Sequence, residues 1–252
     1  MKKYYFVVAI YCMILSNHLF AQKNFHKNER FATVGLGVSG HSCWIVNQNT
    51  YGEPELDYSP KYGLGIYASI GMNFNFNWGL KMEFTFNTMG QNYDGYKSQN
   101  TIYIDRKIDL NYIHIPLMLK YSFGKESLRF YFMAGPALGI LHSASQSYKQ
   151  KTGNSWVDSW TYYNPEIHEF IDVSKHEIWS RYKTYNIVGI LDFGADILLS
   201  RNFFINTGIR LQYTINDINA TQFQLLNNKG VYEPSHNFTG GVVLGIHRKI
   251  NY

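Results

Sequence analysis

The sequence predicts an all-β protein, an eight-stranded antiparallel up-and-down transmembrane β-barrel with short periplasmic turns and long extracellular loops. Three observations lead to this prediction: alternating apolar runs of strand length, connections that alternate between long and short, and two clusters of aromatic residues. The composition agrees, because aromatic residues make up 17% of the 252-residue chain and charged residues only 16%. Soluble domains carry about a quarter charged residues, and Tyr, Phe, Gly and Asn favour strands and turns.

The first residues of the chain have the pattern of a secretory signal peptide. Lys2 and Lys3 precede the apolar run YYFVVAIYCMIL, which ends near LFAQ, and such a segment is removed from the mature protein. We expect cleavage after Ala21, so that residues 1–21 are the signal peptide, 22–30 a short periplasmic segment and 31–252 the barrel. A retained membrane anchor is the alternative.

Charge and cysteine content exclude several classes of protein. Removing residues 1–21 takes away two lysines and no acidic residue, so the net charge falls from +5 to +3. This small excess gives no reason to expect a nucleic-acid partner. Cys43 is then the one cysteine left, so disulfides are not expected to hold the fold. An exported, cysteine-poor chain suggests a Gram-negative cell envelope.

Eight runs of alternating apolar residues have about the length that a tilted strand needs to cross a bilayer. In the second run, Leu64, Ile66, Ala68, Ile70 and Met72 share one face. A soluble barrel would bury this face, whereas a membrane barrel turns it to lipid and keeps polar residues inside. The runs cover residues 31–40, 61–73, 79–89, 110–123, 128–141, 186–199, 203–213 and 237–252.

The connections favour the membrane barrel. Those at 41–60, 90–108, 142–185 and 214–236 are long, while those at 74–78, 122–127 and 200–202 are short, as external loops and periplasmic turns require. Aromatic residues gather toward both ends of the runs, which is typical of the two membrane interfaces. The short-turn group is Phe74, Phe76, Trp78, Tyr121, Phe123, Phe203 and Tyr252, and the long-loop group is Trp44, Tyr103, Tyr185 and Tyr213.

Two local features leave alternatives open. Asn164 could cap a helix that begins at Pro165 in the longest loop, and an irregular loop is the other interpretation. Pro116 and Pro136 stand in neighbouring runs. Because proline removes a ladder hydrogen bond, they suggest a local bulge or bend.

Three segments resemble the PorT-family outer-membrane barrels, the outer membrane protein beta-barrel domain proteins of Gram-negative bacteria. YIHIPLMLKY (112–121) is similar to that family's Tyr-x-Glu-Ile-Pro-Leu-Leu-Leu-Lys-Tyr strand, AGPALGIL (134–141) to its Gly-Pro strand, and GADILLSRNFFINTGIRLQYTINDI (194–218) to its penultimate hairpin. The resemblance implies an eight-stranded outer-membrane barrel and, for some members, a link to protein secretion machinery. His114 stands where the family has a glutamate, so a carboxylate role is not carried over.

Charged residues on the polar face predict a structural network inside the barrel. An eight-stranded barrel is filled by side chains, and unpaired charges there would be costly. We therefore expect Glu83, Asp192 and Asp196 to pair with Arg210, Lys81 or Lys249. A narrow ion path is the alternative. The predicted network comprises Lys81, Glu83, His114, Lys120, Arg129, Asp192, Asp196, Arg210, His247 and Lys249.

Motifs that would carry catalysis or cofactor binding are weak. GLGVSG fits a dinucleotide fingerprint by letter, but that site needs a following helix, and HSCWIVNQNT reads as loop. His168 and His176 share the longest loop with several acidic residues, without a recognised metal-ligand spacing. We predict no catalytic residue, cofactor or metal. An outer-membrane lipid-modifying enzyme and a periplasmic lipocalin-like barrel are the remaining alternatives.

The expected function is therefore that of an envelope-structural or protein-interaction component with a packed, non-conducting lumen, serving as an accessory to secretion. Its partners would be outer-membrane lipid and an envelope protein or glycan that binds loop 142–185. Exposed aromatic residues beside mixed charge favour such contacts. The predicted contact residues are Trp156, Trp160, Tyr162, Tyr163 and Trp179.

Overall fold

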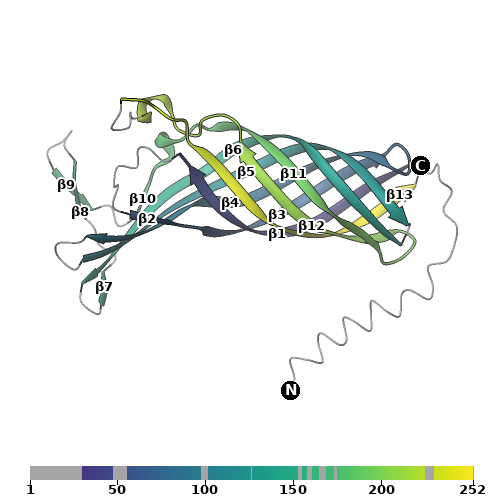
Figure 1. Cartoon of the computed structure of the whole chain (residues 1–252), viewed down its shortest axis with the longest axis horizontal. Coiled ribbons are helices and arrows are strands. Elements are labelled where there is room, and N and C mark those ends of the chain that lie inside the picture. Colours follow the sequence, from purple (N-terminus) through teal and green to yellow (C-terminus); the bar gives the residue numbers. More distant parts are fainter. Residues whose placement is uncertain are drawn as a thin grey trace, which may run out of the picture.

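Eight long antiparallel strands form a closed barrel in the computed structural model (Figure 1). Each strand pairs with the next along the chain, and β13 pairs with β1 to close the cylinder. The predicted eight-stranded antiparallel barrel is confirmed. The strands are β1 (Phe31–Val46), β3 (Lys61–Asn73), β4 (Trp78–Lys97), β5 (Ile102–Lys125), β6 (Leu128–Thr152), β11 (Tyr185–Leu198), β12 (Phe203–Thr214) and β13 (His236–Asn251).

The structure describes residues 30–47, 56–97, 102–125, 127–152, 155–157, 161–164, 169–172, 175–224 and 230–251. The predicted signal peptide and all of the predicted periplasmic segment except Arg30 lie outside these ranges. Five short strands and two 3-10 helices complete the described elements. They are β2 (Leu56–Ser59), β7 (Ser155–Val157), β8 (Thr161–Asn164), β9 (Glu169–Asp172), β10 (Lys175–Glu177), η2 (Trp179–Arg181) and η3 (Thr221–Phe223).

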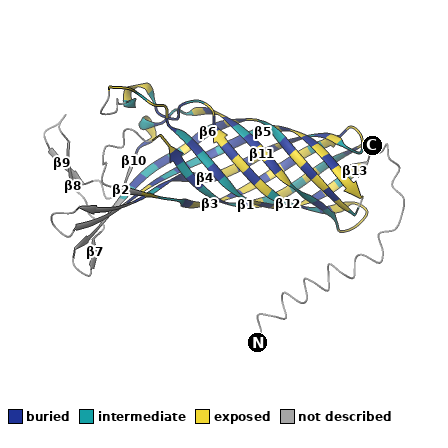
Figure 2. Ribbon diagram, viewed as in Figure 1, coloured by how far each residue is buried: buried dark blue, intermediate teal, exposed yellow. Residues whose placement is uncertain are grey.

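Exposed and buried residues alternate along the barrel strands (Figure 2). On β3 the outward side chains from Tyr62 to Met72 are apolar and exposed, with Ile66 63% exposed, while Lys61 and Ser69 are buried. A water-soluble barrel would show the reverse, because burying apolar area is favourable in water and exposing it is not. This outer surface therefore suits contact with lipid.

Aromatic residues mark both ends of the apolar outer surface. At the end with the short connections, the turn end, Trp78 packs on Tyr121 with ring centroids 4.9 Å apart. At the opposite end, the loop end, Trp44 stacks on Phe238 at 5.9 Å, and Tyr185 is exposed. Amphipathic rings prefer the boundary between hydrocarbon and water.

The turn end is closed by tight hydrogen-bonded turns. Between β3 and β4, the Phe74 amide donates to the Trp78 carbonyl at 2.9 Å. The Asn75 carboxamide oxygen accepts from the Asn77 and Trp78 amides at 2.9 and 2.8 Å. This Asx arrangement explains why an NFNFNW segment reverses the chain without glycine or proline. Figure 1 places the C-terminus at this same end.

Three strands continue beyond the barrel at the loop end, which corrects the prediction of a loop over 90–108. β4 and β5 remain paired to Lys97 and Ile102, and β6 follows β5 to Lys151. β2 pairs with β4, and β7 and β10 with β6. We call this sheet the external arm: residues 94–97, 102–107 and 145–152 with β2, β7 and β10 (Figure 1).

The sequence analysis did not predict the arm, and the reason is physical. Away from lipid a paired strand needs no apolar face, so its sequence loses the period of two residues that marks a half-buried strand. The segment GQNYDGYKSQN is polar at both parities and was therefore interpreted as loop. Tyr103 consequently lies on the arm, opposite Lys151, on the loop-end side of the barrel.

The β-bulge lies away from the two prolines. Asn111 pairs with Ser143 and Tyr112 with Leu141, so β6 gains one residue at His142. Pro116 and Leu119 keep one constant register with β6, so the prolines interrupt the ladder without shifting it. Of the predicted bulge or bend at Pro116 and Pro136, the bulge is therefore wrong, and the bend stays a prediction. An extra residue changes which parity of β6 faces inward, and Leu141 and Ala144 are accordingly both buried.

The longest predicted loop contains further strands. β8 and β9 form a separate two-stranded sheet where the sequence allowed a short helix, and residues 165–168 lie outside the described ranges. Over the part of the chain that the structure describes, no helix is both long and apolar enough to cross a membrane.

Candidate functional site

An ion cluster around Arg210 crosses the middle of the lumen. The Arg210 guanidinium donates to both carboxylate oxygens of Glu83 at 2.7 and 3.0 Å and to Asp192 at 2.7 and 3.0 Å. Asp192 is the direct cross-strand neighbour of Arg210, whereas Glu83 projects from β4 on the opposite wall. Forked donor geometry lets one guanidinium hold two carboxylates. This cluster therefore ties opposite sides of the barrel together.

Two more ion pairs lie next to the cluster. Lys81 lies 2.8 Å from Glu83, and Lys120 lies 2.5 Å from Asp196. Asn206 also donates to Asp196, at 2.7 Å. The sequence analysis expected Arg210, Lys81 or Lys249 as the partner of Asp196. The structure brings Lys120 there instead. The ladder sets Lys120 opposite Met133, and Met133 opposite Asp192, so the lysine reaches Asp196 four residues further along β11.

His114 occupies an uncharged layer of the lumen. Its side chain is 2% exposed, its Nδ1 accepts a hydrogen bond from Asn87 at 3.0 Å, and its ring stacks on Tyr112 with centroids 5.5 Å apart. Gly139 on the next strand leaves room for the ring, since a Cβ there would lie 3.0 Å from it. These contacts are those of a packed, neutral residue.

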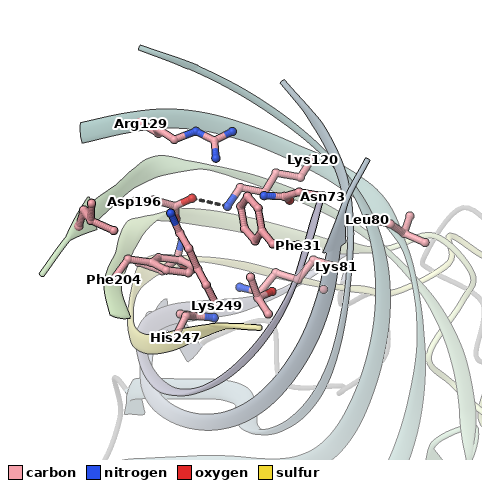
Figure 3. Close-up of a pocket in the computed structure, with 14 residues that line it drawn as sticks. Phe31, Asn73, Leu80, Lys81, Lys120, Arg129, Asp196, Phe204, His247 and Lys249 are labelled. Atoms are coloured by element: carbon pink, nitrogen blue, oxygen red, sulfur yellow. Dashed lines mark hydrogen bonds and ion pairs between the residues drawn. The ribbon is translucent and has the colours of Figure 1, made fainter. Parts of the chain in front are cut away.

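Arg129, His247 and Lys249 lie near the turn end of the lumen (Figure 3). Arg129 donates to the Phe76 carbonyl, and Lys249 lies over the Phe31 ring at 5.0 Å. His247 stacks on Phe204 at 5.0 Å. Nine of the ten predicted network residues are buried, and Lys249 is half-buried at the mouth.

Glycines make space for two tyrosines that the sequence analysis did not identify. A Cβ at Gly37 would lie 2.3 Å from Tyr67, and one at Gly208 would lie 2.5 Å from the Tyr131 hydroxyl. Gly37 belongs to GLGVSG, and β1 continues as a strand through Val46, so no helix N-terminus follows that motif. Both tyrosines share the inward parity of the charged residues, a signal that could have found them.

The loop-end half of the lumen is filled by apolar side chains. This apolar plug combines inward residues of the strands with three residues from the connections. The sequence analysis missed the plug, because several of its strand residues lie where loop was predicted. Its members are Cys43, Ile45, Met89, Tyr93, Ile108, Leu110, Tyr112, Leu141, Ala144, Ile178, Tyr182 and Ile218.

A buried lysine sits beside the plug. Lys61 donates to the Met89 and Ile108 carbonyls at 2.9 and 3.1 Å and to Asp109. Gly90 has a φ of +132°, and a Cβ there would lie 2.0 Å from the Ile108 carbonyl oxygen. Only glycine adopts that conformation readily, so Gly90 lets the lysine reach all three acceptors.

The connections fold over the loop end as a lid, which we define as residues 178–184 and 215–220. The Lys183 amide donates to the Ile218 carbonyl at 2.7 Å, and the Ala220 amide to the Arg181 carbonyl at 2.9 Å. Asp217 anchors this lid. It accepts from Tyr232 at 2.5 Å, from Gln224 at 2.6 Å and from the Asn219 and Ser235 amides at 3.1 and 3.0 Å.

The Asp217 anchor predicts a pH-dependent lid. Burial acts to raise the pKa of this carboxyl, but the donated hydrogen bonds outweigh it and hold the pKa below its usual range. A carboxyl whose pKa is lower in the folded than in the unfolded state stabilises the fold. This stabilisation is fully present above the ordinary pKa of about 4, and it is lost as the pH falls through the folded-state pKa. Hydrogen exchange of the Ala220 amide, corrected for intrinsic rates, should therefore accelerate below about pH 4.

The matching substitution is Asp217→Asn. Hydrogen bonds to a charged group contribute about 1.5–3 kcal/mol, so exchange at Ala220 should rise roughly 10- to 150-fold at neutral pH. Thr221→Ala, at an exposed position of the same connection, is the control and should leave the rate unchanged. Equal effects of both substitutions would contradict the anchor.

The structure places the predicted contact residues only in part. Trp156 lies in β7, Tyr162 and Tyr163 in β8, and Trp179 in η2, where it is 45% exposed. Trp160 and His168 lie outside the described ranges, and His176 lies in β10. Within those ranges, no three His, Cys, Asp or Glu side chains are grouped to hold a metal ion.

Comparisons with known proteins find several solved structures to which this chain is similar. Neisserial surface protein A is similar at 12% identity over 88% of this chain and 97% of its own, with a TM-score of 0.43. The attachment invasion locus protein Ail of Yersinia pestis is similar at 12% identity over 88% of this chain and 99% of its own, with a TM-score of 0.41. OprG of Pseudomonas aeruginosa is similar at 14% identity over 90% of this chain and 98% of its own, with a TM-score of 0.39. No curated protein matches in sequence.

A family model provides the assignment. It is described as outer membrane protein beta-barrel domain and matches residues 20–220, which covers most of the closed barrel. A barrel in the outer membrane requires an apolar outer surface with aromatic residues at both ends, and this barrel has both. The chain belongs to the outer membrane protein beta-barrel domain family, and it is an outer-membrane β-barrel protein.

Proposed function

We propose that this protein is a non-enzymatic, non-conducting barrel that serves as an interaction component of the outer envelope. The observation that carries the proposal is the filled lumen. Buried ion pairs occupy its turn-end half, the apolar plug its loop-end half, and the lid lies over the plug. A continuous water path for ions is thereby disfavoured, since ions need polar, hydrated passage.

The external arm supports contact with a partner as the role. It extends the sheet of β4, β5 and β6 beyond the barrel, and a hydrogen-bonded sheet has less conformational entropy to lose on binding than an unpaired loop. Trp179 is exposed at its base, and tryptophan is enriched in binding hot spots. A protein or glycan of the envelope is the proposed partner. The PorT resemblance makes an accessory role in protein secretion the specific form of this proposal.

One replacement tests both parts of the proposal. Ser147 pairs with Lys175, so a two-residue Asn-Gly turn can replace residues 148–174 and keep the remaining register. We expect the shortened protein to stay folded, with heat-modifiable gel mobility. A photocrosslinking residue at Trp179 should capture an envelope partner in the full chain but not in the shortened one. The same probe at lipid-facing Leu64 is the control.

Planar bilayer recordings complete the test. Neither protein should show discrete conductance steps, because residues 148–174 belong to neither the plug nor the lid. Regular conductance steps from the full-length protein would contradict the proposal and would indicate a pore. Equal capture in both proteins would move the partner site away from the longest connection.

A further inference from the structure

A charged side chain interrupts the apolar outer surface of the barrel near its turn end. Arg248 projects outward from β13, three residues before the end of the strand, between the exposed Ile246 and Ile250. Its guanidinium lies over the Phe203 ring at 5.9 Å, and among the described residues it forms no ion pair with a carboxylate. At such a depth a long cationic side chain reaches the level of the lipid headgroups.

Two more exposed arginines lie at the same end of the neighbouring strands. Arg201 lies in the turn before β12, two residues from Phe203, which is the cross-strand neighbour of Arg248. Arg30 directly precedes β1, the strand that pairs with β13 on its other side. Figure 1 shows the C-terminal end of β13 at the turn end. Three arginines are therefore distributed over one sector of that end, formed by β12, β13 and β1.

Acidic residues are absent from this sector. Residues 30–36, 198–206 and 246–251 contain none, so within these described segments no carboxylate offsets the arginines. The connection between β3 and β4, residues 74–77, has neither an acid nor a base. Positive charge is thus a property of this sector and not of every turn at this end. Clustered cations beside a membrane attract anionic lipids.

A groove in the outer surface begins at this basic sector. Its volume is about 390 Å³, and β1, β3, β12 and β13 line it. The ladder sets Arg248 opposite Val34, and Leu36 follows two residues farther from the turn end, opposite Ala68 of β3. The groove therefore runs from the charged residue into the apolar surface. We call it the outer groove, and its outward side chains are those of Val34, Leu36, Ala68, Phe203, Ile246 and Arg248.

Ala68 makes this part of the surface hollow. The outward residues next to it on β3 are Ile66 and Ile70, and its cross-strand neighbours are Leu36 on β1 and Phe84 on β4. A methyl group among four large side chains leaves space that a linear, apolar chain can fill. Van der Waals packing favours an acyl chain there, since lipid tails are as apolar as leucine and gain nothing from leaving other lipid.

We propose that the outer groove binds one phospholipid with a net negative headgroup, from the periplasmic leaflet of the membrane. The phosphate lies at Arg248, and one acyl chain lies along Leu36 and Ala68. The leaflet follows from the short turns, which face the periplasm in barrels of this kind. The charge of the headgroup follows from the three arginines, because a zwitterionic headgroup brings a cation that they repel. This site goes beyond the proposed partner binding, which belongs to the opposite end of the barrel.

Native mass spectrometry of the full-length protein, released from detergent micelles, measures the binding of single lipids. Phosphatidylglycerol and phosphatidylethanolamine with identical acyl chains are titrated separately. We expect the first phosphatidylglycerol to bind at least about fivefold more tightly, the factor that one cation beside an anionic lipid surface contributes. Equal affinities would overturn the proposal, since any apolar surface then explains the binding. Tighter binding of lipopolysaccharide than of phosphatidylglycerol would also overturn it.

Substitutions of Arg248 test the headgroup site. Arg248→Gln should weaken binding of the first phosphatidylglycerol about fivefold and leave phosphatidylethanolamine unchanged, whereas Arg248→Lys should keep most of the affinity. Lys125→Gln removes an exposed lysine from the end of β5 and is the matched control. If Arg248→Gln and Lys125→Gln weaken binding equally, the attraction is general to the turn end and the site is wrong.

A substitution of Ala68 tests the place of the acyl chain. Ala68→Phe fills the outer groove without making the surface polar, and it should lower the affinity for phosphatidylglycerol at least as much as Arg248→Gln does. Ala195→Phe makes the same change at an outward position of β11, away from the groove, and should have no effect. Heat-modifiable gel mobility shows that each variant is folded. Unchanged binding by folded Ala68→Phe would contradict the outer groove as the site.

Discussion

Replacing Arg210 with methionine is expected to destabilise the barrel by about 3–5 kcal/mol, the usual cost of removing one partner from a buried ion pair. The side chain is 4% exposed and holds Glu83 and Asp192 together. Without it, Glu83 keeps Lys81 nearby and Asp192 keeps the hydrogen bond from the Tyr131 hydroxyl, and neither contact replaces the guanidinium. Urea unfolding in detergent micelles or lipid vesicles, followed by tryptophan fluorescence and gel mobility, measures the loss.

A double substitution separates charge from shape. Arg210→Met and Asp192→Asn together remove one cation and one carboxylate and leave the Lys81–Glu83 ion pair in place, and replacing a complete buried ion pair is often neutral or stabilising. We therefore expect the double variant to recover most of the stability that Arg210→Met loses. If the double variant is as unstable as the single one, the role of Arg210 is packing of its long side chain and not neutralisation.

Arginine placed at the centre of the outer surface should produce the second large effect. Ile66 lies midway along the outward residues of β3, between Tyr62 and Met72. Arg on the lipid face of a barrel costs about 2–4 kcal/mol at the bilayer midplane and about 0–1 kcal/mol near an interface. Ile66→Arg should therefore lower the unfolding free energy in vesicles far more than Met72→Arg does.

The comparison of these two positions also tests whether the outer face of β3 contacts lipid. Both residues are outward on the same strand, so they differ mainly in their expected depth. Folding kinetics and equilibrium unfolding in phosphatidylcholine vesicles give the two free energies. Equal, small losses at both positions would mean that the outer face of β3 meets water, as in a periplasmic lipocalin-like barrel.

Much of the barrel could be predicted because lipid and lumen impose opposite demands on alternate residues. All eight predicted transmembrane runs coincide with strands β1, β3, β4, β5, β6, β11, β12 and β13. The external arm could not be predicted in this way. Its strands extend into water, where both faces may be polar and pairing leaves no period in the sequence.

The same reasoning predicted which side chains point into the lumen, but it did not predict which of them contact one another. Parity identifies which side chains point inward, and the ten predicted polar residues all lie in or at the mouth of the lumen. Parity does not say which of them meet. Lys120 reaches Asp196 because the strands tilt and stagger around the closed barrel, and that stagger depends on every register in the sheet.

The sequence by itself determined the strand number, the outward apolar face, the polar interior and the end of the barrel that carries the short turns. Each follows from a local alternation that the membrane enforces residue by residue. Tertiary structure alone decided the ion-pair partners, the apolar plug, the lid and the outer groove. These join residues such as Glu83 and Arg210, which are distant along the chain, and only closure of the sheet brings them together.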